Sequence, residues 1–249
     1  GSKKPEVVLL CHLDTVWPIG SFNPVWKVEG DIVRGPGIYD MKAGFIQALY
    51  SMKDLDRTRV ALIATTDEET GSATTRTLIE DVSKIAKAVL VLESAIDGKL
   101  KVGRKGTSWY RITIHGRAAH AGLEPEKGVN ATVEVARIVS ELTKLENKSL
   151  GTSVVPTTMT SGTTTNTVPA LATLDIDSRS FSLDEMQRID SAIRSITPIH
   201  PDARIEIAGG INRPPLETSA TLPLYQLAEK LAKDAGISTL GSASVGGAS

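Results

Sequence analysis

The sequence predicts an α/β protein, with a mixed or parallel sheet flanked by helices and an inserted ferredoxin-like α+β domain. Two observations indicate this class. Short apolar segments alternate with helical patterns over the N-terminal part of the chain, which is typical of right-handed βαβ units. From Trp109 onward the order becomes strand, helix, strand, strand, helix, strand, which is the ferredoxin-like arrangement. We therefore expect a first domain comprising residues 1–106 and 215–249, and an inserted domain comprising residues 107–214.

The first part of the chain contains three continuously apolar runs, which predict strands buried on both faces of a parallel sheet. They are residues 7–11, 60–64 and 88–92. A helix is expected over residues 41–55, because Phe45, Leu49 and Met52 form one apolar stripe at helical spacing. Two further elements are a helix over residues 75–85 and a short connecting strand over residues 28–34.

The inserted domain is predicted from two amphipathic helices and four strands. The helices cover residues 129–145 and 183–196, and the strands cover residues 109–115, 153–159, 172–178 and 204–208. Residues 174–177 alternate apolar and acidic side chains, which indicates a strand with one face in water. Beyond the insert we expect an amphipathic helix over residues 222–235. The small residues at 241–249 predict a loop with no further element, so the chain is expected to stop within the first domain.

The overall composition excludes several classes of partner. A formal net charge of −1 and an isoelectric point of about 6.5 provide no basic surface for nucleic acid or an anionic membrane. The apolar runs are too short to cross a bilayer, so we expect neither a nucleic-acid nor a membrane partner. The single cysteine, Cys11, lies in an apolar run and is expected to be a buried thiol, which is compatible with the cytoplasmic location that we expect.

Acidic and imidazole side chains recur where successive predicted elements end or begin. They are His12 with Asp14, Asp40, the triplet Asp67-Glu68-Glu69, and Glu93. Because open α/β sheets place their sites at the carboxyl ends of strands, we expect these groups to converge. Each has a simpler explanation when taken alone: Asp40 as a helix N-cap, His12 with Asp14 as a structural pair, and the triplet as a solvated turn. Together they form the pattern of a two-metal site.

The residue types fit zinc chemistry. Zinc in catalytic sites takes imidazole nitrogen and carboxylate oxygen, and two ions about 3.5–4 Å apart need a bridging carboxylate. Asp40 suits the bridge, because its short side chain lies on a loop between the other donors. His12 would bind one ion with Glu93 as a candidate ligand to the same ion, and Asp14 would accept the second imidazole N–H.

Glu68 and Glu69 are neighbours, so their side chains leave the backbone in different directions. One can bind metal while the other takes a proton from the attacking water. A carboxylate beside a metal-bound water, whose pKa is about 7, is a workable general base. Which glutamate binds which ion is left open by the residues themselves.

Three motifs, in this order along the chain, resemble the signatures of the co-catalytic zinc peptidases and deacylases. They are His12-Leu13-Asp14-Thr15-Val16, Gly35-Pro36-Gly37 with Asp40-Met41-Lys42, and Asp67-Glu68-Glu69-Thr70-Gly71-Ser72. The family includes glutamate carboxypeptidase, which this chain resembles most, acetylornithine deacetylase and succinyl-diaminopimelate desuccinylase. The resemblance runs from about Val7 to Ser249.

The resemblance implies a role for each residue of the cluster. Its ligands would be His12, Asp40, Glu69 and Glu93, with Asp40 as the bridge, Glu68 as the general base and Asp14 behind His12. It also implies two zinc ions per subunit, which cobalt or manganese could replace, and a cis peptide between Asp40 and Met41. The first domain would be the catalytic domain, and the insert would form a homodimer.

Further matches lie in the insert. The segment at residues 116–122 is similar to the family segment whose histidine reaches the partner's site, which implies that His120 donates in trans to the oxyanion of the tetrahedral intermediate. Asn166 and Arg179 match positions that hold the substrate's carboxylate, and Arg213 is a looser third candidate. Without the resemblance, His120 is a turn histidine and the other three are equally surface salt-bridge residues.

The chain departs from the family at both ends. Family members have a helical portion before the first strand, and a last histidine ligand after a Gly-Gly-x-x-Asp-like turn near the C-terminus. This chain ends at Ser249, just after Gly246-Gly247, and none of its 4 histidines fits that last role. We therefore expect one metal site to lack a ligand, and the chain to be part of a longer enzyme.

The expected function is that of a carboxypeptidase-like, metal-dependent hydrolase. It would cleave the amide bond next to an amino acid with a free carboxylate, using a metal-bound hydroxide. The nearest alternative is a deacylase of N-acyl amino acids with the same site, so the expected substrate is a small peptide or an N-acyl amino acid. An alternative from another class is a catalytically inert fragment that binds ligand or dimerises.

Overall fold

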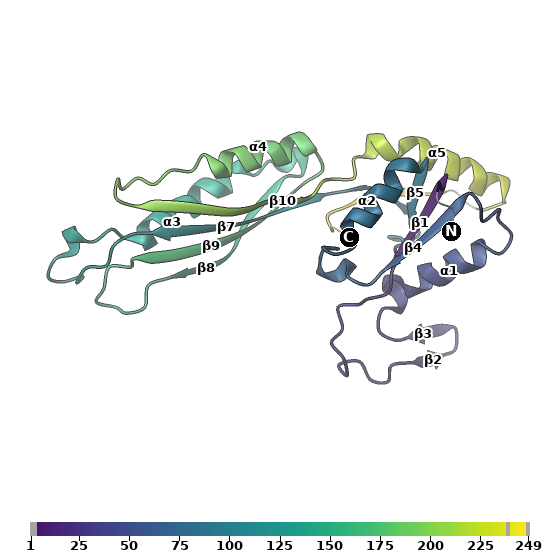
Figure 1. Cartoon of the computed structure of the whole chain (residues 1–249), viewed down its shortest axis with the longest axis horizontal. Coiled ribbons are helices and arrows are strands. Elements are labelled where there is room, and N and C mark those ends of the chain that lie inside the picture. The colour runs from purple at the N-terminus through teal and green to yellow at the C-terminus, as the bar shows by residue number, and fades with distance from the viewer. Residues whose placement is uncertain (1–3, 238–239, 248–249) are drawn as a thin grey trace. The chain divides into compact units, whose positions relative to one another are not determined.

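The computed structural model describes residues 4–237 and 240–247 (Figure 1). Contacts along the chain divide it into two compact units, residues 1–98 and residues 99–248. This division groups residues 215–247 with the insert, and the domain boundaries expected at residues 106 and 214 stay predictions. Each unit is described by itself.

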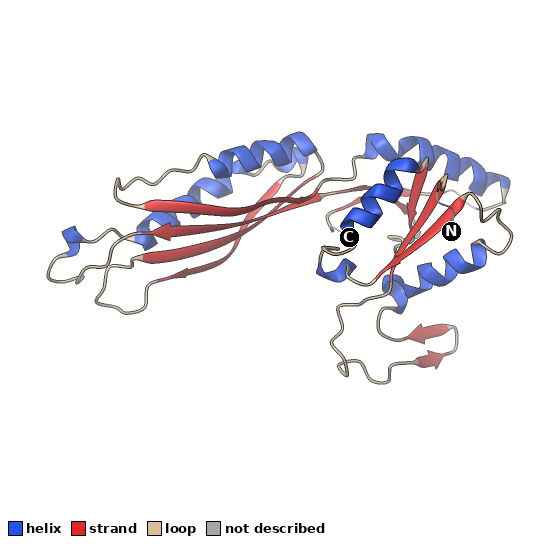
Figure 2. Ribbon diagram, in the orientation of Figure 1, coloured by secondary structure: helices blue, strands red, loops and turns tan. Residues whose placement is uncertain are grey.

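The first unit contains a three-stranded parallel sheet, with strand β1 (Val7–His12) between β4 (Val60–Thr65) and β5 (Ala88–Val91). Helices α1 (Ala43–Ser51) and α2 (Arg76–Ile85) connect these strands. Successive residues of β1 face opposite sides of the sheet, so both faces need a cover. Leu9 packs with Ala48 of α1 on one face, while Val8 packs with Val82 of α2 on the other. The parallel strands predicted from the apolar runs are confirmed (Figure 2), and β1 and β4 are largely buried, whereas Leu90 and Val91 of β5 are exposed.

Two sequence expectations in this unit need correction. The single strand expected over residues 28–34 is a hairpin of β2 (Lys27–Glu29) and β3 (Ile32–Arg34), because Gly30 adopts a φ of 59° and turns the chain back. The helix expected from residue 41 begins at Ala43, after the irregular turn Ile38–Lys42. A short 3₁₀ turn covers Glu68–Thr70.

The second unit contains a four-stranded antiparallel sheet in the order β10-β7-β9-β8. Its strands are β7 (Gly106–His115), β8 (Ser153–Ser161), β9 (Leu171–Ser180) and β10 (Arg204–Arg213), and its helices are α3 (Ala131–Leu142) and α4 (Leu183–Arg194). Ile138 and Ile189, one from each helix, pack with Leu174 of β9 in one core. The neighbouring Asp175 and Asp177 lie on the other face of the sheet. The ferredoxin-like order and the strand with one wet face are both confirmed.

Three more elements complete this unit. Strand β6 (Leu100–Arg104), which the sequence did not predict, pairs in parallel with β11 (Ser242–Val245). The expectation of a loop without further elements at residues 241–249 is therefore wrong for β11, because neighbour pairing rather than apolar pattern makes this strand. Helix α5 covers Thr218–Asp234 and starts earlier than expected. Short helical turns cover Pro125–Lys127, Thr143–Leu145 and Lys148–Leu150.

Across the described residues, no helix combines the length and the apolar character that crossing a bilayer requires.

One carboxylate ties together the starts of the three parallel strands. Glu6 accepts hydrogen bonds from Arg59 Nε (2.9 Å) and Nη2 (2.6 Å), and from Lys87 Nζ (3.0 Å). These residues directly precede β1, β4 and β5, so the clamp fixes the strands at the end opposite their carboxyl ends. The hydrogen bonds from Arg59 and then Lys87 lower the pKa of Glu6 to about 2.

We expect Glu6→Gln to lower the free energy of unfolding at pH 7, because the clamp loses its charge. The folded-state pKa is lowered, so this stabilisation is present above the unfolded pKa of about 4.3 and is lost as the pH falls towards about 2. The difference between the variant and the wild type should shrink over that window in urea unfolding followed by circular dichroism. Asp54→Asn, in an exposed turn of the same unit, is the control. A difference that does not change with pH would contradict the clamp.

Candidate metal centre

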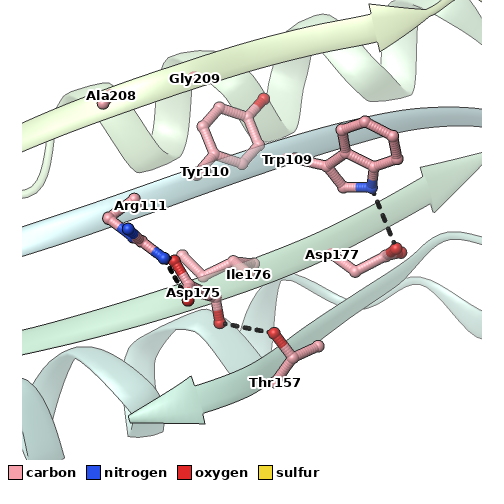
Figure 3. A pocket seen from close by; sticks show the side chains of 9 residues that line it. All are labelled: Trp109, Tyr110, Arg111, Thr157, Asp175, Ile176, Asp177, Ala208 and Gly209. Carbon is pink, nitrogen blue, oxygen red and sulfur yellow. Dashed lines mark hydrogen bonds and ion pairs between the residues drawn. The ribbon is translucent and has the colours of Figure 1, made fainter. Parts of the chain in front are cut away.

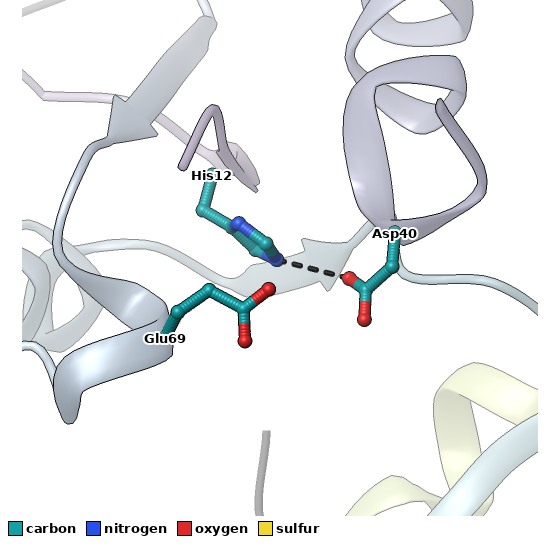
Figure 4. A group of neighbouring side chains, drawn as sticks. All are labelled: His12, Asp40 and Glu69. Carbon is teal, nitrogen blue, oxygen red and sulfur yellow. Dashed lines mark hydrogen bonds and ion pairs between the residues drawn. The ribbon is translucent and has the colours of Figure 1, made fainter. Parts of the chain in front are cut away.

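Four segments of the first unit bring their polar side chains to the carboxyl ends of the parallel strands. His12 ends β1, Asp40 lies in the turn before α1, Glu69 lies in the turn after β4, and Glu93 follows β5. One ligand atom each from His12, Asp40 and Glu69 lies within 4.8 Å of the others, a set that could hold a metal ion. Figure 4 shows these three side chains pointing towards a common point. The predicted convergence at the strand ends is thus present in the structure.

The imidazole of His12 is the centre of the group and only 2% exposed. Its Nε2 lies 3.1 Å from Asp40 Oδ1, 3.5 Å from Glu93 Oε1 and 3.9 Å from Glu68 Oε2. Burial lowers the pKa of His12, but the negative charges of Glu93 and Glu68 and the hydrogen bond with Asp40 raise it overall. Burial, followed by the charge of Asp40, raises the pKa of Glu69. A concentration of carboxylates around one imidazole nitrogen is what a site for divalent cations requires.

Asp14 contacts two members of the group. His12 Nδ1 lies 3.2 Å from the backbone oxygen of Asp14 and 3.4 Å from its Oδ1. The other oxygen, Asp14 Oδ2, accepts the backbone N–H of Glu69 at 2.9 Å. The position behind His12 was expected, whereas the contact with Glu69 was not. No local signal could have revealed it, because the two residues are 55 positions apart.

The turn that carries Asp40 is shaped by close backbone approaches. Gly37 adopts a φ of 68°, and a Cβ at Gly35 would lie 2.6 Å from the carbonyl oxygen of Val25. The peptide between Asp40 and Met41 is cis, as the resemblance implied. Asp40 is not the N-cap of α1, since that position belongs to Lys42. The simpler explanation of Asp40 as a helix cap is therefore wrong.

Asp67 organises the acidic turn, a role that the sequence did not reveal. Its carboxylate accepts the backbone N–H groups of Thr74 (2.8 Å) and Thr75 (3.2 Å) and both of their hydroxyls. The hydroxyls of Thr74 and Thr75 are the first causes that lower the pKa of Asp67 to about 2. Its neighbours Glu68 and Glu69 are half-buried, so the triplet is not merely a solvated turn.

The second unit holds the other predicted residues in two separate places. His120 and Asn166 lie on paired segments beyond one end of the four-stranded sheet, where Ala121 N–H donates to the carbonyl oxygen of Asn166 at 2.8 Å. Arg179 and Arg213 lie at the other end, where both are register partners of Thr107 in β7. The structure thus groups these four residues into two pairs.

Arg179 forms a salt bridge with the neighbouring Asp177. The sequence left open this alternative, that Arg179 is a surface salt-bridge residue. Its Nε and Nη2 donate to the two oxygens of Asp177 at 2.8 and 3.0 Å, and its Nη1 donates to the Gly246 carbonyl oxygen at 3.2 Å. An arginine has five N–H groups, so each terminal nitrogen keeps one more hydrogen to donate.

A hollow of about 500 Å³ lies on the face of this sheet that the helices do not cover (Figure 3). Its charged groups already have partners: Arg111 donates to Asp175 at 2.6 and 2.9 Å, while Asp177 accepts from Arg179 and, at 3.3 Å, from Trp109 Nε1. No residue predicted to carry chemistry lines it. The hollow is thus a surface feature of the sheet in the second unit.

The fold and the cluster together define a candidate metal centre at the strand ends of an α/β domain. Comparison with known proteins agrees with this class. Residues 102–200 match the M20 peptidase dimerisation domain. The chain is 37% identical over 183 residues to carboxypeptidase G2 of Pseudomonas sp. strain RS-16, covering 70% of this chain and 44% of that protein. It is 34% identical over 155 residues to succinyl-diaminopimelate desuccinylase of Sulfurovum sp. strain NBC37-1, covering 55% of this chain and 41% of that protein.

Solved structures agree on the fold. Aminopeptidase PepT of Bacillus cereus superposes with a TM-score of 0.76 at 19% identity, covering 100% of this chain and 69% of that structure. The YXEP protein of Bacillus subtilis, described as a dinuclear metal binding peptidase from the M20 family, superposes with a TM-score of 0.67 at 16% identity, covering 99% of this chain and 67% of that structure. Residues 102–200 thus match the M20 dimerisation domain, and the chain as a whole is similar in fold to M20 peptidases. It spans about half the length of the curated relatives that it matches, with 44% and 56% for the first two.

Gly44 lets helix α1 touch the strand end that leads to Glu93. A Cβ at Gly44 would lie 1.9 Å from the carbonyl oxygen of Leu92, the residue before Glu93. In an open helix, alanine is more stable than glycine by about 1 kcal/mol. Here the clash with rigid backbone should reverse that sign, because overpacking costs about 1–3 kcal/mol.

We therefore expect Gly44→Ala to lower the free energy of unfolding by up to about 2 kcal/mol and to weaken metal binding, because Leu92 and Glu93 must move. Chemical denaturation and metal titration measure the two effects. Gln47→Ala, at an exposed position of the same helix, should change neither by much. A more stable Gly44→Ala variant would show that α1 does not press on this strand end.

Proposed function

We propose that this chain provides the metal centre and the dimerisation domain of a zinc-dependent carboxypeptidase. The enzyme would cleave the amide bond next to an amino acid that has a free carboxylate. The observation that carries the proposal is the convergence of His12, Asp40 and Glu69, with ligand atoms within 4.8 Å of one another, at the ends of parallel strands. The similarity to carboxypeptidase G2 supports the reaction class. The cytoplasmic location remains part of this proposal.

Apart from the last histidine ligand noted above, the donor set fits two zinc ions, with cobalt or manganese as substitutes. His12 and Glu93 would bind one ion and Glu69 the other, with Asp40 between them, and the distances from His12 Nε2 to Asp40 (3.1 Å) and Glu93 (3.5 Å) support this arrangement. When bound, the ions would polarise the substrate carbonyl and supply a nucleophilic water at neutral pH. Asp14 would hold the His12 ring through Nδ1 and the Glu69 backbone through its N–H.

Glu68 is the proposed general base. Its Oε2 lies 3.9 Å from His12 Nε2, and its side chain is 18% exposed, so it stands beside the proposed ligands within reach of substrate. Glu68 would take the proton from the attacking water and pass it to the nitrogen of the leaving amine. Its neighbour Glu69 is then the ligand, which is the division of roles that adjacent side chains permit.

The two pairs in the second unit support a site completed by a second copy of the chain. About eight residues of β9 separate the end near Asn166 from Arg179, which at about 3.3 Å per residue is roughly 26 Å. A dipeptide spans only about 7 Å. One small substrate therefore cannot touch both His120 and Arg179 of the same copy. We propose that His120 and Asn166 act in the site of the partner copy, while Arg179 and Arg213 hold the substrate's carboxylate.

The edge strand β8 is the proposed dimer contact. It is nine residues long and, among the residues that the structure describes, it pairs only with β9, which leaves its other edge for another chain. Near this edge Met159 is 53% exposed and Val133 of α3 is 66% exposed. A hydrogen bond of 2.7 Å between the hydroxyls of Thr132 and Ser161 ties the start of α3 to the end of β8. The open edge and the two apolar side chains fit joining of the two sheets across a two-fold axis.

A deacylase of N-acyl amino acids on the same site is the second candidate. The identity of 34% to a succinyl-diaminopimelate desuccinylase favours it. The two functions use the same metal chemistry and differ in the acyl group that they release. Hydrolysis of peptides ending in glutamate, compared with acetyl and succinyl amino acids, distinguishes them.

In the zinc-loaded protein, we expect Glu68→Gln to lower kcat by about 10²–10⁴-fold, because proton transfer loses its base. The zinc content, measured by elemental analysis, should stay unchanged. Glu80→Gln, which removes an exposed carboxylate paired with Arg76 on α2, should keep full activity. Unchanged turnover in the Glu68 variant would rule out its role as base.

For the dimer, we expect Met159→Glu to shift the mass in solution from two chains towards one, because a charge at the joined edge must be desolvated. Sedimentation velocity measures the change. Leu150→Glu, at a 51% exposed position in the same unit, should leave the mass unchanged. A Met159 variant that remains as dimeric as the wild type would place the contact elsewhere.

A further inference from the structure

His120 is held by its own loop in a specific way. Its Nδ1 accepts the backbone N–H of Gly122 at 3.1 Å and the backbone N–H of Leu123 at 3.2 Å. A backbone amide can only donate, so Nδ1 must present its lone pair to both. A hydrogen on Nδ1 would point into these two N–H groups. The loop is therefore compatible with a ring that carries its hydrogen on Nε2.

We infer that the backbone amides of Gly122 and Leu123 are positioning groups that lock His120 as the neutral Nε2–H tautomer, a donor to a substrate oxygen. This inference rests on the proposed function for its catalytic meaning. The contact geometry of the loop carries it independently.

Backbone hydrogen bonds hold the loop around His120, so the contacts to its ring follow from the backbone conformation. The carbonyl oxygen of His120 accepts the N–H of Glu124 at 3.1 Å, which closes the turn. On either side of His120, Ala121 N–H donates to Asn166 at 2.8 Å and Val168 N–H donates to Ala119 at 2.9 Å. These bonds pair the histidine segment with the segment around Asn166. The N–H of Gly122 is directed at the ring, while the N–H of Leu123 is shared between Nδ1 and the carbonyl oxygen of His120, which it reaches at 3.3 Å.

The other ring nitrogen faces outward. His120 is exposed, and among the residues that the structure describes none accepts a hydrogen bond from Nε2. The N–H at this position therefore keeps its full capacity for an acceptor from outside the chain. A carbonyl oxygen that gains negative charge during attack is the acceptor that such a donor stabilises most.

The position of the ring hydrogen also determines which chemical roles are open to His120. A metal ligand or a general base would need a lone pair on the outward nitrogen, whereas the lock places a hydrogen there. His120 should thus neither bind metal nor take a proton through Nε2. This division leaves proton transfer to Glu68 and gives His120 the role of a neutral donor.

Two substitutions at Gly122 form a matched pair. A Cβ at this position would lie 3.6 Å from His120 Cε1 and 3.7 Å from Nδ1, which is ordinary contact, so Gly122→Ala should keep the loop. Gly122→Pro removes the N–H that donates to Nδ1. At His120 itself, glutamine places an amide donor near the position of Nε2, whereas asparagine places it near Nδ1.

The deciding measurement is a long-range ¹H–¹⁵N correlation spectrum of the histidine-labelled protein near pH 8, with His120 assigned by its loss in His120→Ala. The wild type and Gly122→Ala should show Nδ1 without hydrogen and Nε2 with it, and Gly122→Pro should show a mixture. We expect kcat/KM to fall by about 10²–10³-fold in His120→Asn and clearly less in His120→Gln.

A wild-type spectrum with the hydrogen on Nδ1 would overturn the inference, whatever the activity. A wild-type protein that hydrolyses none of the test substrates would contradict the proposed function, while the spectrum would still decide the tautomer. Equal activity of the asparagine and glutamine variants would overturn the role of Nε2–H as a donor.

Discussion

The crowding of negative charge around one buried imidazole is the constraint on which the candidate site depends. Asp40, Glu68 and Glu93 each place an oxygen within 3.9 Å of His12 Nε2, and Glu69 lies within the same group. Like charges about 4 Å apart repel by about 4 kcal/mol at an effective dielectric constant of 20. A fold keeps such a group together only if its backbone holds the residues and a positive charge offsets the repulsion. Divalent cations supply that charge and at the same time supply hydrolytic chemistry.

The backbone holds the group through elements that are rigid for separate reasons. The parallel strands end side by side, Gly44 lets α1 touch Leu92, and the carboxylate of Asp67 fixes the turn that carries Glu68 and Glu69. Asp14 links the imidazole to that turn. These contacts, which lie outside the cluster around His12, thus offset the repulsion between its carboxylates. In the second unit, the antiparallel sheet keeps His120 and Arg179 at opposite ends.

Much of this architecture was predictable from the sequence, and the successes share one physical basis. Apolar runs such as Val7–Cys11 identify buried strands, and neighbouring strand ends bring their following residues together, which places His12 near Glu69 and Glu93. The failures also share a basis. The β6–β11 pair is made by backbone pairing of small residues, and the Asp14–Glu69 contact joins positions 55 residues apart. Neither leaves a periodic pattern that local reasoning can detect.

The central claim is that side chains from four strand-end segments hold two cations. Anomalous scattering at the zinc edge, from crystals of the protein saturated with zinc, tests it most directly. The account predicts two peaks about 3.5–4 Å apart, with Asp40 between them, His12 at one and Glu69 at the other. Crystals in which zinc is bound elsewhere, and in which the carboxylates of Asp40 and Glu69 face apart with His12 remote from both, would contradict it.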